Sequence, residues 1–449
     1  MSKAIRTIQY LGSKATFTDL IKEKITNITN QNEIVCDLFA GTGVIAQTLA
    51  ETNTVYANDI QEYSSLICKV LLSNYDKKNH ILNYKELVES KEYKKNKDYL
   101  TNIFKDQLKK EAEFLNNADK ENVKNLCLSN VFYDGSLIDK NNEFVNDFYG
   151  STVKYFSTNY INRIKGAGFP YALFTLYYSE GYFSLKQCIE IDSLKYAIDR
   201  INIKNENNRN FLLVCLMHSV SEIVSTVGKN FAQPIKIVNS KGEIKSAAIK
   251  RCINDRKLGL EEPFTCMYNK LLEKFVVKDN NIIFCEDSLT LINSGALNNV
   301  KTFYLDPPYT NDHYSRFYHV LETLVKYDYP SLATKKVKGE TKLMNGRYRT
   351  DRYQSNFSIP SKTEGEFRTL IEKIHENHSN VVLSYSELDK DKEMRERIMT
   401  KEKLTDILTS YYQNIEIINV NHRYKKLSSK DSNKEEKNDG ELLFVCSYE

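Results

Sequence analysis

The sequence predicts a doubly wound α/β fold with a mixed seven-stranded sheet, interrupted by a mainly helical insertion. Three observations predict it. Short apolar runs at residues 34–36, 54–58 and 302–305 have the composition of buried parallel strands, and each leads into an aspartate. A glycine-rich turn and a helical apolar pattern follow the first run, as in a β-α-β unit. The middle of the chain carries helical stripes of apolar residues in place of further strands.

The helical insertion and the last strands have their own local signals. Ser184 is placed to cap the start of an amphipathic helix, and the apolar run from Phe211 to Val227 is expected to be its buried partner. The final strand, residues 441–446, is expected to form an antiparallel hairpin with the strand at residues 415–418. The predicted blocks of the chain are residues 1–75, 76–278 and 279–449.

The most informative motif is the Asp-Pro-Pro-Tyr tetrapeptide after the strand at residues 302–305. It follows the carboxyl end of a strand, where open α/β sheets bind their ligands. Its two prolines fix two φ angles and remove two N–H donors, which leaves a stiff loop with free carbonyl groups. A carboxylate and a carbonyl can accept both N–H groups of a nucleobase amine, while a tyrosine ring stacks on a base extruded from its duplex. The alternative is an Asp-capped turn with a packing tyrosine. The candidate catalytic residues are Asp306, Pro307, Pro308 and Tyr309.

The turn after the first strand is a candidate ligand loop. Gly41 and Gly43 let the backbone pass close to a bound molecule because neither residue has a Cβ. The spacing is not the G-x-G-x-x-G of dinucleotide sites, and the lysine of a phosphate-binding P-loop is missing. The loop therefore indicates an adenosyl-amino acid rather than a pyrophosphate. Asp59 ends the next strand, where a carboxylate can accept both hydroxyls of a ribose.

A third strand, residues 282–284, leads into two further acids, Glu286 and Asp287. Asp287 is the preferred ligand for the adenine amine of an adenosyl donor. Glu286 stays the alternative, because spacing alone does not decide between the two.

These pieces, in this order, resemble the Dam-like class of DNA adenine-N6 methyltransferases. Residues 10–14, Tyr-Leu-Gly-Ser-Lys, are similar to an N-terminal motif that lines the methionine end of the donor in that family. The donor loop comes first and the catalytic tetrapeptide last, as in this class, and the family places target recognition in the insertion between them. The match covers the two outer segments, residues 1–74 and 281–449. The cofactor-binding residues implied by the resemblance are Tyr10, Lys14, Asp37, Phe39, Gly41, Gly43, Asp59 and Asp287.

The resemblance implies an enzyme that moves a methyl group from S-adenosylmethionine to N6 of a flipped adenine in double-stranded DNA. It also implies a host-protection role beside a cognate restriction endonuclease, and no metal. Three alternatives stay open: an RNA base methyltransferase, a cytosine-N4 DNA methyltransferase, and a catalytically silent DNA-binding module. An RNA enzyme would use the same tetrapeptide and donor site.

The most basic stretch of the chain runs from Lys335 to Arg352 and is expected to be a loop beside the catalytic motif. Such a loop is suited to contact with backbone phosphates, and a disordered surface loop is the alternative. A second stretch, from Lys229 to Lys257, has a predicted hairpin tip at Asn239–Glu243 and is also expected to contact DNA. The candidate DNA-binding residues are Lys335, Lys336, Lys338, Arg347, Arg349 and Arg352.

Composition agrees with this interpretation without requiring it. A net charge of +4 over 449 residues is mild, so nucleic-acid binding must depend on local basic patches. The nine cysteines form no C-x-x-C pair, which disfavours zinc and a disulfide framework. The N-terminus begins no apolar signal segment, and we expect no membrane association. These features predict a soluble, intracellular protein, and the resemblance implies the cytoplasm of a bacterial or phage-infected cell and association with the nucleoid.

Overall fold

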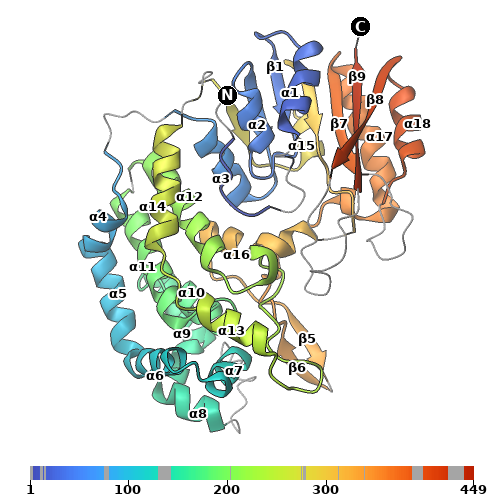
Figure 1. Ribbon diagram of the computed structural model, residues 1–449. Coiled ribbons are helices and arrows are strands. Elements are labelled where there is room, and N and C mark those ends of the chain that lie inside the picture. The colour runs from blue at the N-terminus through green and yellow to red at the C-terminus, as the bar shows by residue number, and fades with distance from the viewer. Residues whose placement is uncertain are drawn as a thin grey trace.

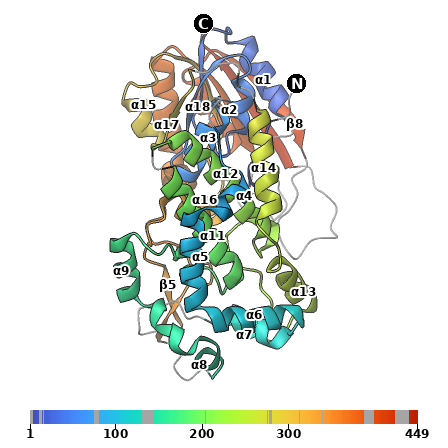
Figure 2. The same cartoon turned by 90° about the vertical axis from the view of Figure 1, so that its left-hand side faces the viewer.

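A computed structural model describes residues 4–10, 14, 17–74, 80–129, 143–202, 204–274, 276, 280–311, 313–337, 339–386, 398–422 and 439–448. The chain folds into a layered α/β part and a mainly helical part beside it (Figure 1). The view from the side shows the helical part extending away from one end of the sheet (Figure 2).

The α/β part contains a seven-stranded sheet with strand order β3-β2-β1-β4-β7-β9-β8. Neighbouring strands from β3 to β7 are parallel, and β9 pairs antiparallel with both β7 and β8. This confirms the predicted mixed seven-stranded sheet and the antiparallel pairing of the last two strands. The strands are β1 (Ile34–Asp37), β2 (Thr54–Asn58), β3 (Ile282–Phe284), β4 (Val300–Leu305), β7 (Asn380–Ser386), β8 (Asn414–His422) and β9 (Asp439–Ser447).

Helices cover both faces of the sheet, as the doubly wound prediction requires. Alternate residues of β4 show this, because Tyr304 packs on one face while Phe303 and Leu305 pack on the other. The first face is covered by α1 (Thr18–Asn27), α2 (Val44–Leu49) and part of α3 (Glu62–Leu71). The second face is covered by α15 (Ser288–Asn293), α17 (Pro360–Glu376) and α18 (Lys401–Thr409).

The helical part is organised around α11 and α12. Ser184 caps α11 in a reciprocal capping box with Gln187, which confirms the predicted helix start. The predicted buried partner is α12, which ends at Ile223 because Val224 is extended. The helices of this part are α4 (Tyr84–Glu89), α5 (Lys91–Ile103), α6 (Lys105–Asn116), α7 (Lys120–Leu128), α8 (Glu143–Tyr149), α9 (Thr158–Ala167), α10 (Leu173–Tyr177), α11 (Leu185–Ile201), α12 (Glu206–Ile223), α13 (Ser246–Asp255) and α14 (Glu261–Glu273), with 3-10 turns η1 (Gly150–Phe156) and η2 (Val227–Lys229).

The two parts share one apolar core at their junction. Helix α16 (Tyr314–Lys326) follows the catalytic tetrapeptide, and its Val320 and Leu324 belong to the same buried cluster as Val70 of α3 and Leu213 of α12. The helical part is therefore held against the sheet by the segment that carries the candidate catalytic motif.

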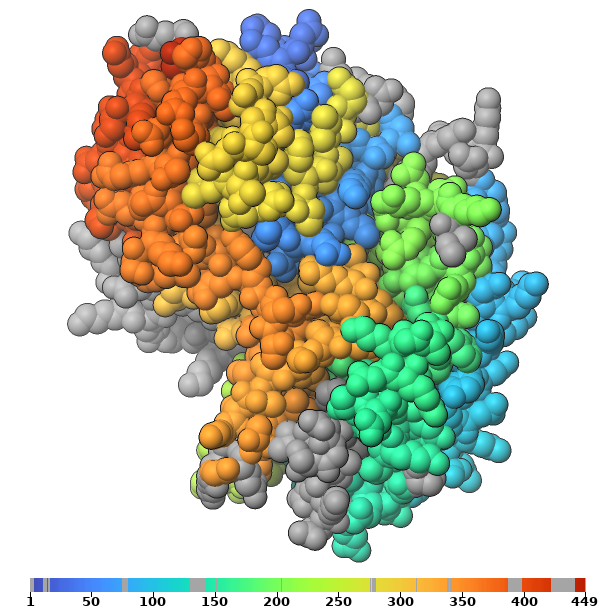
Figure 3. Space-filling model, turned by 180° about the vertical axis from the view of Figure 1, so that it is seen from behind, coloured from blue at the N-terminus to red at the C-terminus, as the bar shows by residue number. Residues whose placement is uncertain are grey.

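The basic stretch after α16 is partly a β-hairpin, where the sequence predicted a loop. Strands β5 (Thr334–Val337) and β6 (Glu340–Leu343) pair antiparallel. Seen from behind, the chain that follows α16 (orange) runs from the α/β part down beside the green helices, and the 3-10 turn η3 (Asn356–Ser358) leads it back to α17 (Figure 3). The predicted hairpin tip at Asn239–Glu243 is confirmed by the bridge between Val238 and Ile244.

None of the helices in the described ranges is long and apolar enough to cross a membrane.

Candidate functional site

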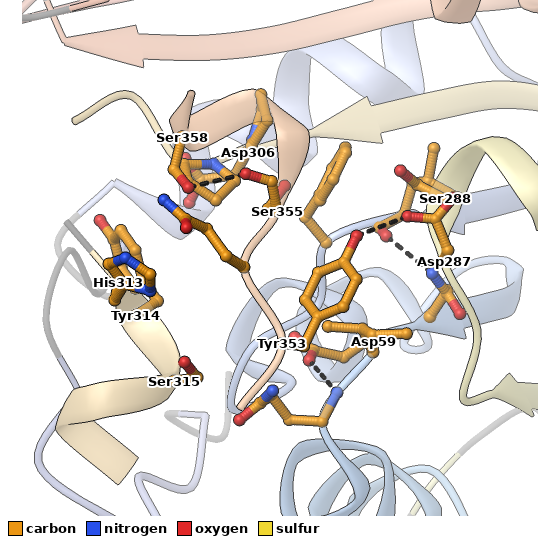
Figure 4. A pocket seen from close by; sticks show the side chains of 18 of the residues that line it. Asp59, Asp287, Ser288, Asp306, His313, Tyr314, Ser315, Tyr353, Ser355 and Ser358 are labelled. Atoms are coloured by element: carbon orange, nitrogen blue, oxygen red, sulfur yellow. Dashed lines mark hydrogen bonds between the residues drawn. The ribbon is translucent and has the colours of Figure 1, made fainter. Parts of the chain in front are cut away.

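A pocket enclosing about 930 Å³ of space lies at the carboxyl ends of β1, β2, β3 and β4 (Figure 4). The sheet order changes direction between β1 and β4, which is where doubly wound folds bind ligands. The pocket brings four of the predicted donor residues (Tyr10, Phe39, Asp59 and Asp287) together with the tetrapeptide, although they come from distant parts of the chain. Its lining includes Tyr10, Phe39, Asp59, Glu286, Asp287, Asp306, Pro307, Pro308 and Tyr309, together with His313–Ser315, Tyr353, Ser355 and Ser358.

The glycine-rich loop has a backbone conformation that favours glycine at two positions. Gly41 and Gly43 have φ angles of +53° and +70°, which side chains larger than glycine rarely adopt. A Cβ on Gly41 would also lie 3.0 Å from the ring of Tyr10. Phe39 packs edge-on against Phe357 with ring centroids 5.3 Å apart. Both glycine positions are therefore determined by local geometry.

Asp37 and Asp59 place two acids next to this loop. Asp59 accepts hydrogen bonds from the N–H groups of Gly41 (3.0 Å) and Gln61 (2.8 Å), and burial raises its pKa to about 6. Asp37 is 1% exposed, and its Oδ1 has no hydrogen-bond partner among the described residues. Burial raises the pKa of Asp37 well above its ordinary value, and the charge of Asp306 raises it further.

The third acid has structural partners of its own. Asp287 Oδ1 accepts from the N–H groups of Leu289 and Thr290 at the start of α15, both at 3.1 Å. Its Oδ2 accepts a 2.6 Å hydrogen bond from the hydroxyl of Tyr353. Figure 4 shows the Tyr353 side chain lying across the pocket between Asp59 and Asp287. Glu286 is exposed at the pocket edge.

The carboxylate of Asp306 lies at the end of β4 beside an ammonium group. Lys14 Nζ is 3.1 Å from Asp306 Oδ1, 3.0 Å from the Tyr309 hydroxyl and 2.6 Å from Glu441 Oε1. Burial raises the pKa of Asp306 to about 7; Lys14 opposes this shift and Glu441 adds to it. Asp306 Oδ1 is buried but accepts no hydrogen bond from the described residues. A second, smaller pocket of about 330 Å³ connects Lys14 and Asp306 with the glycine loop.

Tyr309 presents its ring to the same space. The ring is 7% exposed and packs edge-on against Tyr385, with centroids 5.4 Å apart. The Lys14 ammonium lies 5.0 Å from the Tyr309 ring centroid. The preceding prolines both line the pocket, so the tetrapeptide contributes a carboxylate, carbonyl groups and an aromatic ring to one cavity.

The basic stretch divides into exposed and buried residues, which corrects part of the DNA-binding prediction. Lys335 and Lys336 are exposed on β5, and Arg352 is half-buried beneath the ring of Tyr348 at 4.6 Å. Arg347 and Arg349 do not face solvent, being 5% and 2% exposed. The expectation that these two arginines grip phosphates is therefore wrong for the structure described. Lys338 lies outside the described residues.

Both buried arginines have acidic partners that the sequence did not reveal. Arg347 forms an ion pair with the buried Glu180 and donates a 3.1 Å hydrogen bond to the Tyr177 carbonyl oxygen. Arg349 contacts Asp328 at 2.6 Å and Asp351 at 2.8 Å. The Arg347 contacts attach the segment after the hairpin to the helical part, whereas the Arg349 contacts join residues on either side of the hairpin.

Sequence reasoning missed two residues of the site, Glu441 and Tyr353. Glu441 had a usable signal, since it is an acid directly before the apolar run at residues 442–446. Tyr353 had none, because one tyrosine among basic and polar residues does not indicate a ligand pocket.

Residues 10–169 match the family described as D12 class N6 adenine-specific DNA methyltransferase. The chain is similar to this family over that segment. This match confirms the resemblance to the Dam-like class. The matched segment holds the donor loop and part of the helical part, and it ends before the tetrapeptide.

Curated proteins similar to this chain are named as modification methylases or type II methyltransferases. It is 24% identical to modification methylase LlaI of Lactococcus lactis subsp. lactis, over 84% of this chain and 46% of that protein. It is 23% identical to modification methylase StsI of Streptococcus sanguinis, over 97% of this chain and 51% of that protein. It is 22% identical to type II methyltransferase M.FokI of Planomicrobium okeanokoites, over 90% of this chain and 47% of that protein. The chain thus spans about half the length of these relatives.

Proposed function

We propose that the protein transfers a methyl group from S-adenosylmethionine to N6 of an adenine flipped out of double-stranded DNA. The observation that carries this proposal is the Asp306 carboxylate, whose buried Oδ1 accepts no hydrogen bond from the described residues, while Asp306 lines the smaller pocket together with Gly41 of the glycine loop. A buried acceptor left without a hydrogen bond is costly unless a ligand completes it. An exocyclic amine supplies the missing N–H.

The residues around the glycine loop fit the adenosyl donor. A Cβ at Gly41 would lie against the Tyr10 ring, so the donor would contact the backbone of the loop itself. In this proposal Asp59 accepts from the ribose hydroxyls, and Lys14, Asp37 and Tyr10 surround the amino-acid end. Asp287 is preferred over Glu286 as the adenine ligand because it is half-buried within the pocket wall. The donor supplies a methyl group made electrophilic by its sulfonium charge.

The tetrapeptide performs the rest of the chemistry through position and charge. Asp306 accepts one N–H of the target amine and the Pro307 carbonyl accepts the other, which localises the nitrogen lone pair toward the methyl group. The Tyr309 ring stacks on the flipped base. As the N–C bond forms and the C–S bond breaks, the amine becomes acidic, and its proton passes to Asp306 and then to solvent. No covalent enzyme intermediate is required.

We propose that cations of the basic stretch and of α16 bind the DNA backbone. Lys335 and Lys336 are exposed on the β5–β6 hairpin, which lies below α16 in Figure 1. Arg352 and Arg316 adjoin residues of the pocket wall. Burial lowers the pKa of His313, and the positive charges of Arg352 and Arg316 lower it further, so the two arginines are the cations near this neutral imidazole. Neither arginine forms an ion pair within the described part of the chain, which leaves both available for phosphate.

A cellular role follows from the relatives' names. All three are modification methylases or type II methyltransferases, so we propose that this protein protects bacterial DNA in the cytoplasm against a cognate restriction endonuclease. Among the described residues there is no group of acids, histidines and cysteines placed to hold a metal ion, and the proposed reaction uses none.

The test is methyl transfer from radiolabelled S-adenosylmethionine to duplex DNA and, separately, to total RNA, followed by mass analysis of the digested product. N6-methyladenine in the DNA arm is the expected result. Label in the RNA arm alone, or N4-methylcytosine as the product, would reject the proposal in favour of the corresponding alternative. Sequencing of methylated bases in DNA from expressing cells would then give the recognition site.

A further inference from the structure

Glu441 is a fully buried carboxylate at the edge of the proposed catalytic site. It lies on β9, between Ser386 of β7 and Val420 of β8, and is 0% exposed. Burying an ionised carboxylate is costly unless a cation is held beside it. Lys14 provides that cation, with Nζ 2.6 Å from Glu441 Oε1.

The Lys14 ammonium lies within reach of three acceptors but does not bond to them equally. It donates hydrogen bonds to Glu441 at 2.6 Å and to the Tyr309 hydroxyl at 3.0 Å. Asp306 Oδ1 is 3.1 Å from the ammonium, yet this oxygen accepts no hydrogen bond among the described residues. The shortest of these three contacts is therefore with Glu441, whereas the contact with Asp306 is an ion pair without hydrogen-bond geometry.

We propose that Glu441 is a positioning residue that holds the Lys14 ammonium, so that Asp306 Oδ1 stays free to accept the N–H of the target amine. This inference rests on the proposed function, since it assigns Asp306 the role of amine acceptor. Without the charge of Glu441, Lys14 would turn its N–H toward Asp306. The acceptor would then be occupied before the substrate arrived.

The charges around Asp306 determine how the variant should respond to pH. One ammonium serves the buried Glu441 and the partly buried Asp306, so Glu441 competes with Asp306 for the same cation and raises the pKa of Asp306. Removing the charge of Glu441 lowers that pKa. The groups that face Asp306 from the surrounding elements are Lys14, Glu441, Asp37, Tyr304, Tyr10 and Tyr309.

The first test compares the pH profile of kcat for wild type and Glu441→Gln. We expect the acid limb to move to lower pH in the variant and the plateau kcat to fall about 10- to 100-fold, as when a supporting residue is lost. KM for the donor should stay within about threefold, because Glu441 is absent from the lining of the donor pocket. An unmoved acid limb, or a loss of kcat that only follows a loss of folded protein, would overturn the proposal.

A double-mutant cycle separates positioning from general destabilisation. If Glu441 acts through Lys14, Glu441→Gln should cost nothing further in a Lys14→Met background, so the two effects are not additive. Additive losses would count against the proposal. The matched control is Glu416→Gln on the neighbouring strand, where an exposed glutamate contacts Lys24 at 2.9 Å; it should leave the pH profile unchanged.

A structural readout keeps the inference testable even if the wild type transfers no methyl group. A crystal structure of Glu441→Gln should show Lys14 Nζ hydrogen-bonded to Asp306 Oδ1. Lys14 remaining beside residue 441, with Asp306 Oδ1 still lacking a hydrogen bond, would overturn the positioning role. Absence of transfer by the wild type to any nucleic acid would instead reject the proposed function.

Discussion

The N–H of Gly41 donates a 3.0 Å hydrogen bond to Asp59 Oδ2, which ties the glycine loop after β1 to the acid after β2. The Asp59 carboxylate thereby fixes the position of the loop, and its second oxygen accepts a 2.8 Å hydrogen bond from Gln61 N–H. The same carboxylate thus shapes the loop and faces the pocket. Loop geometry and proposed ribose recognition depend on each other.

Gly41→Ala should weaken donor binding by at least about tenfold, because the added Cβ meets the Tyr10 ring at 3.0 Å at a φ of +53°. Calorimetric titration with S-adenosylhomocysteine measures the effect. The control is Gly365→Ala on an exposed position of α17, where a Cβ meets nothing within 4 Å. That change should preserve affinity and raise stability by about 0.5–1 kcal/mol. Equal affinities for the two variants would show that the loop does not bind the donor.

Asp306→Ala should reduce kcat by about 10³-fold or more while donor affinity stays near that of wild type, because the carboxylate acts on the amine and not on the donor. Single-turnover transfer and donor titration measure the two quantities. Asp406→Ala, an exposed acid on α18, serves as the control and should change neither. Loss of donor binding with transfer intact per bound donor would refute the role given to Asp306.

Activity should fall below about pH 7, since Asp306 must be ionised to accept an N–H and its pKa is raised to about 7, chiefly by burial. The logarithm of kcat is expected to rise with a slope near one through the acid limb and then level off. A profile that is flat from roughly pH 5.5 to 8 would contradict the assignment. The pH dependence of protein stability provides an independent check on the raised pKa of Asp306, because the direction of the stability change is fixed by the direction of the pKa shift.

The folded-state pKa of Asp306 is raised from 3.8 to about 7. Between these two pH values the folded protein therefore holds a proton on Asp306 that the unfolded chain has released. The stability that Asp306 contributes is therefore present below pH 3.8 and is lost as pH rises through about 7. Asp306→Asn should remove this pH dependence. Thermal unfolding of both proteins across the window measures it.

Lys335→Ala combined with Lys336→Ala should weaken DNA binding by about tenfold and reduce the salt dependence of log K by roughly two counterions. Donor affinity should not change, because the hairpin does not line the donor pocket. The control removes Lys91 and Lys94, two exposed lysines on α5 at the opposite side of the helical part (Figure 1). Equal losses for both pairs would indicate a general charge effect and no specific contact.

Arg347→Ala should destabilise the fold by about 3–5 kcal/mol, because it leaves the buried Glu180 without its cation. Denaturant unfolding measures this loss. Lys335→Ala should leave the unfolding midpoint unchanged, since that side chain is exposed. If Arg347→Ala instead weakened DNA binding with full stability, the original sequence-based role of this arginine would be restored.

Much of the donor site could be predicted because its signals are local. The glycine loop, Asp59 and Asp306 each follow a short apolar strand, and parallel strands bring their carboxyl ends to one edge of a sheet. The sequence of each strand and turn is enough to place these residues. The capping box at Ser184 is readable for the same reason, as its two partners are three positions apart.

The basic stretch shows where local reasoning fails. Its composition indicated a single cationic surface, but Arg347 is buried whereas Lys335 is exposed. The difference depends on Glu180, which lies 167 positions from Arg347 in the sequence. No local sequence pattern indicates that Glu180 pairs with this arginine. Composition gives the charge of a segment, whereas burial depends on what the fold packs against it.

By itself the sequence determined which acids and glycines lie at the carboxyl edge of the sheet. Strand, turn and acid patterns specify this because each depends on backbone geometry within a few residues. Only the tertiary structure decided which charges meet. Lys14 and Glu441 are 427 positions apart and come together because β9 inserts between β7 and β8. Electrostatic pairing acts through space, and its energy is set by distance and exclusion of water rather than by separation along the chain.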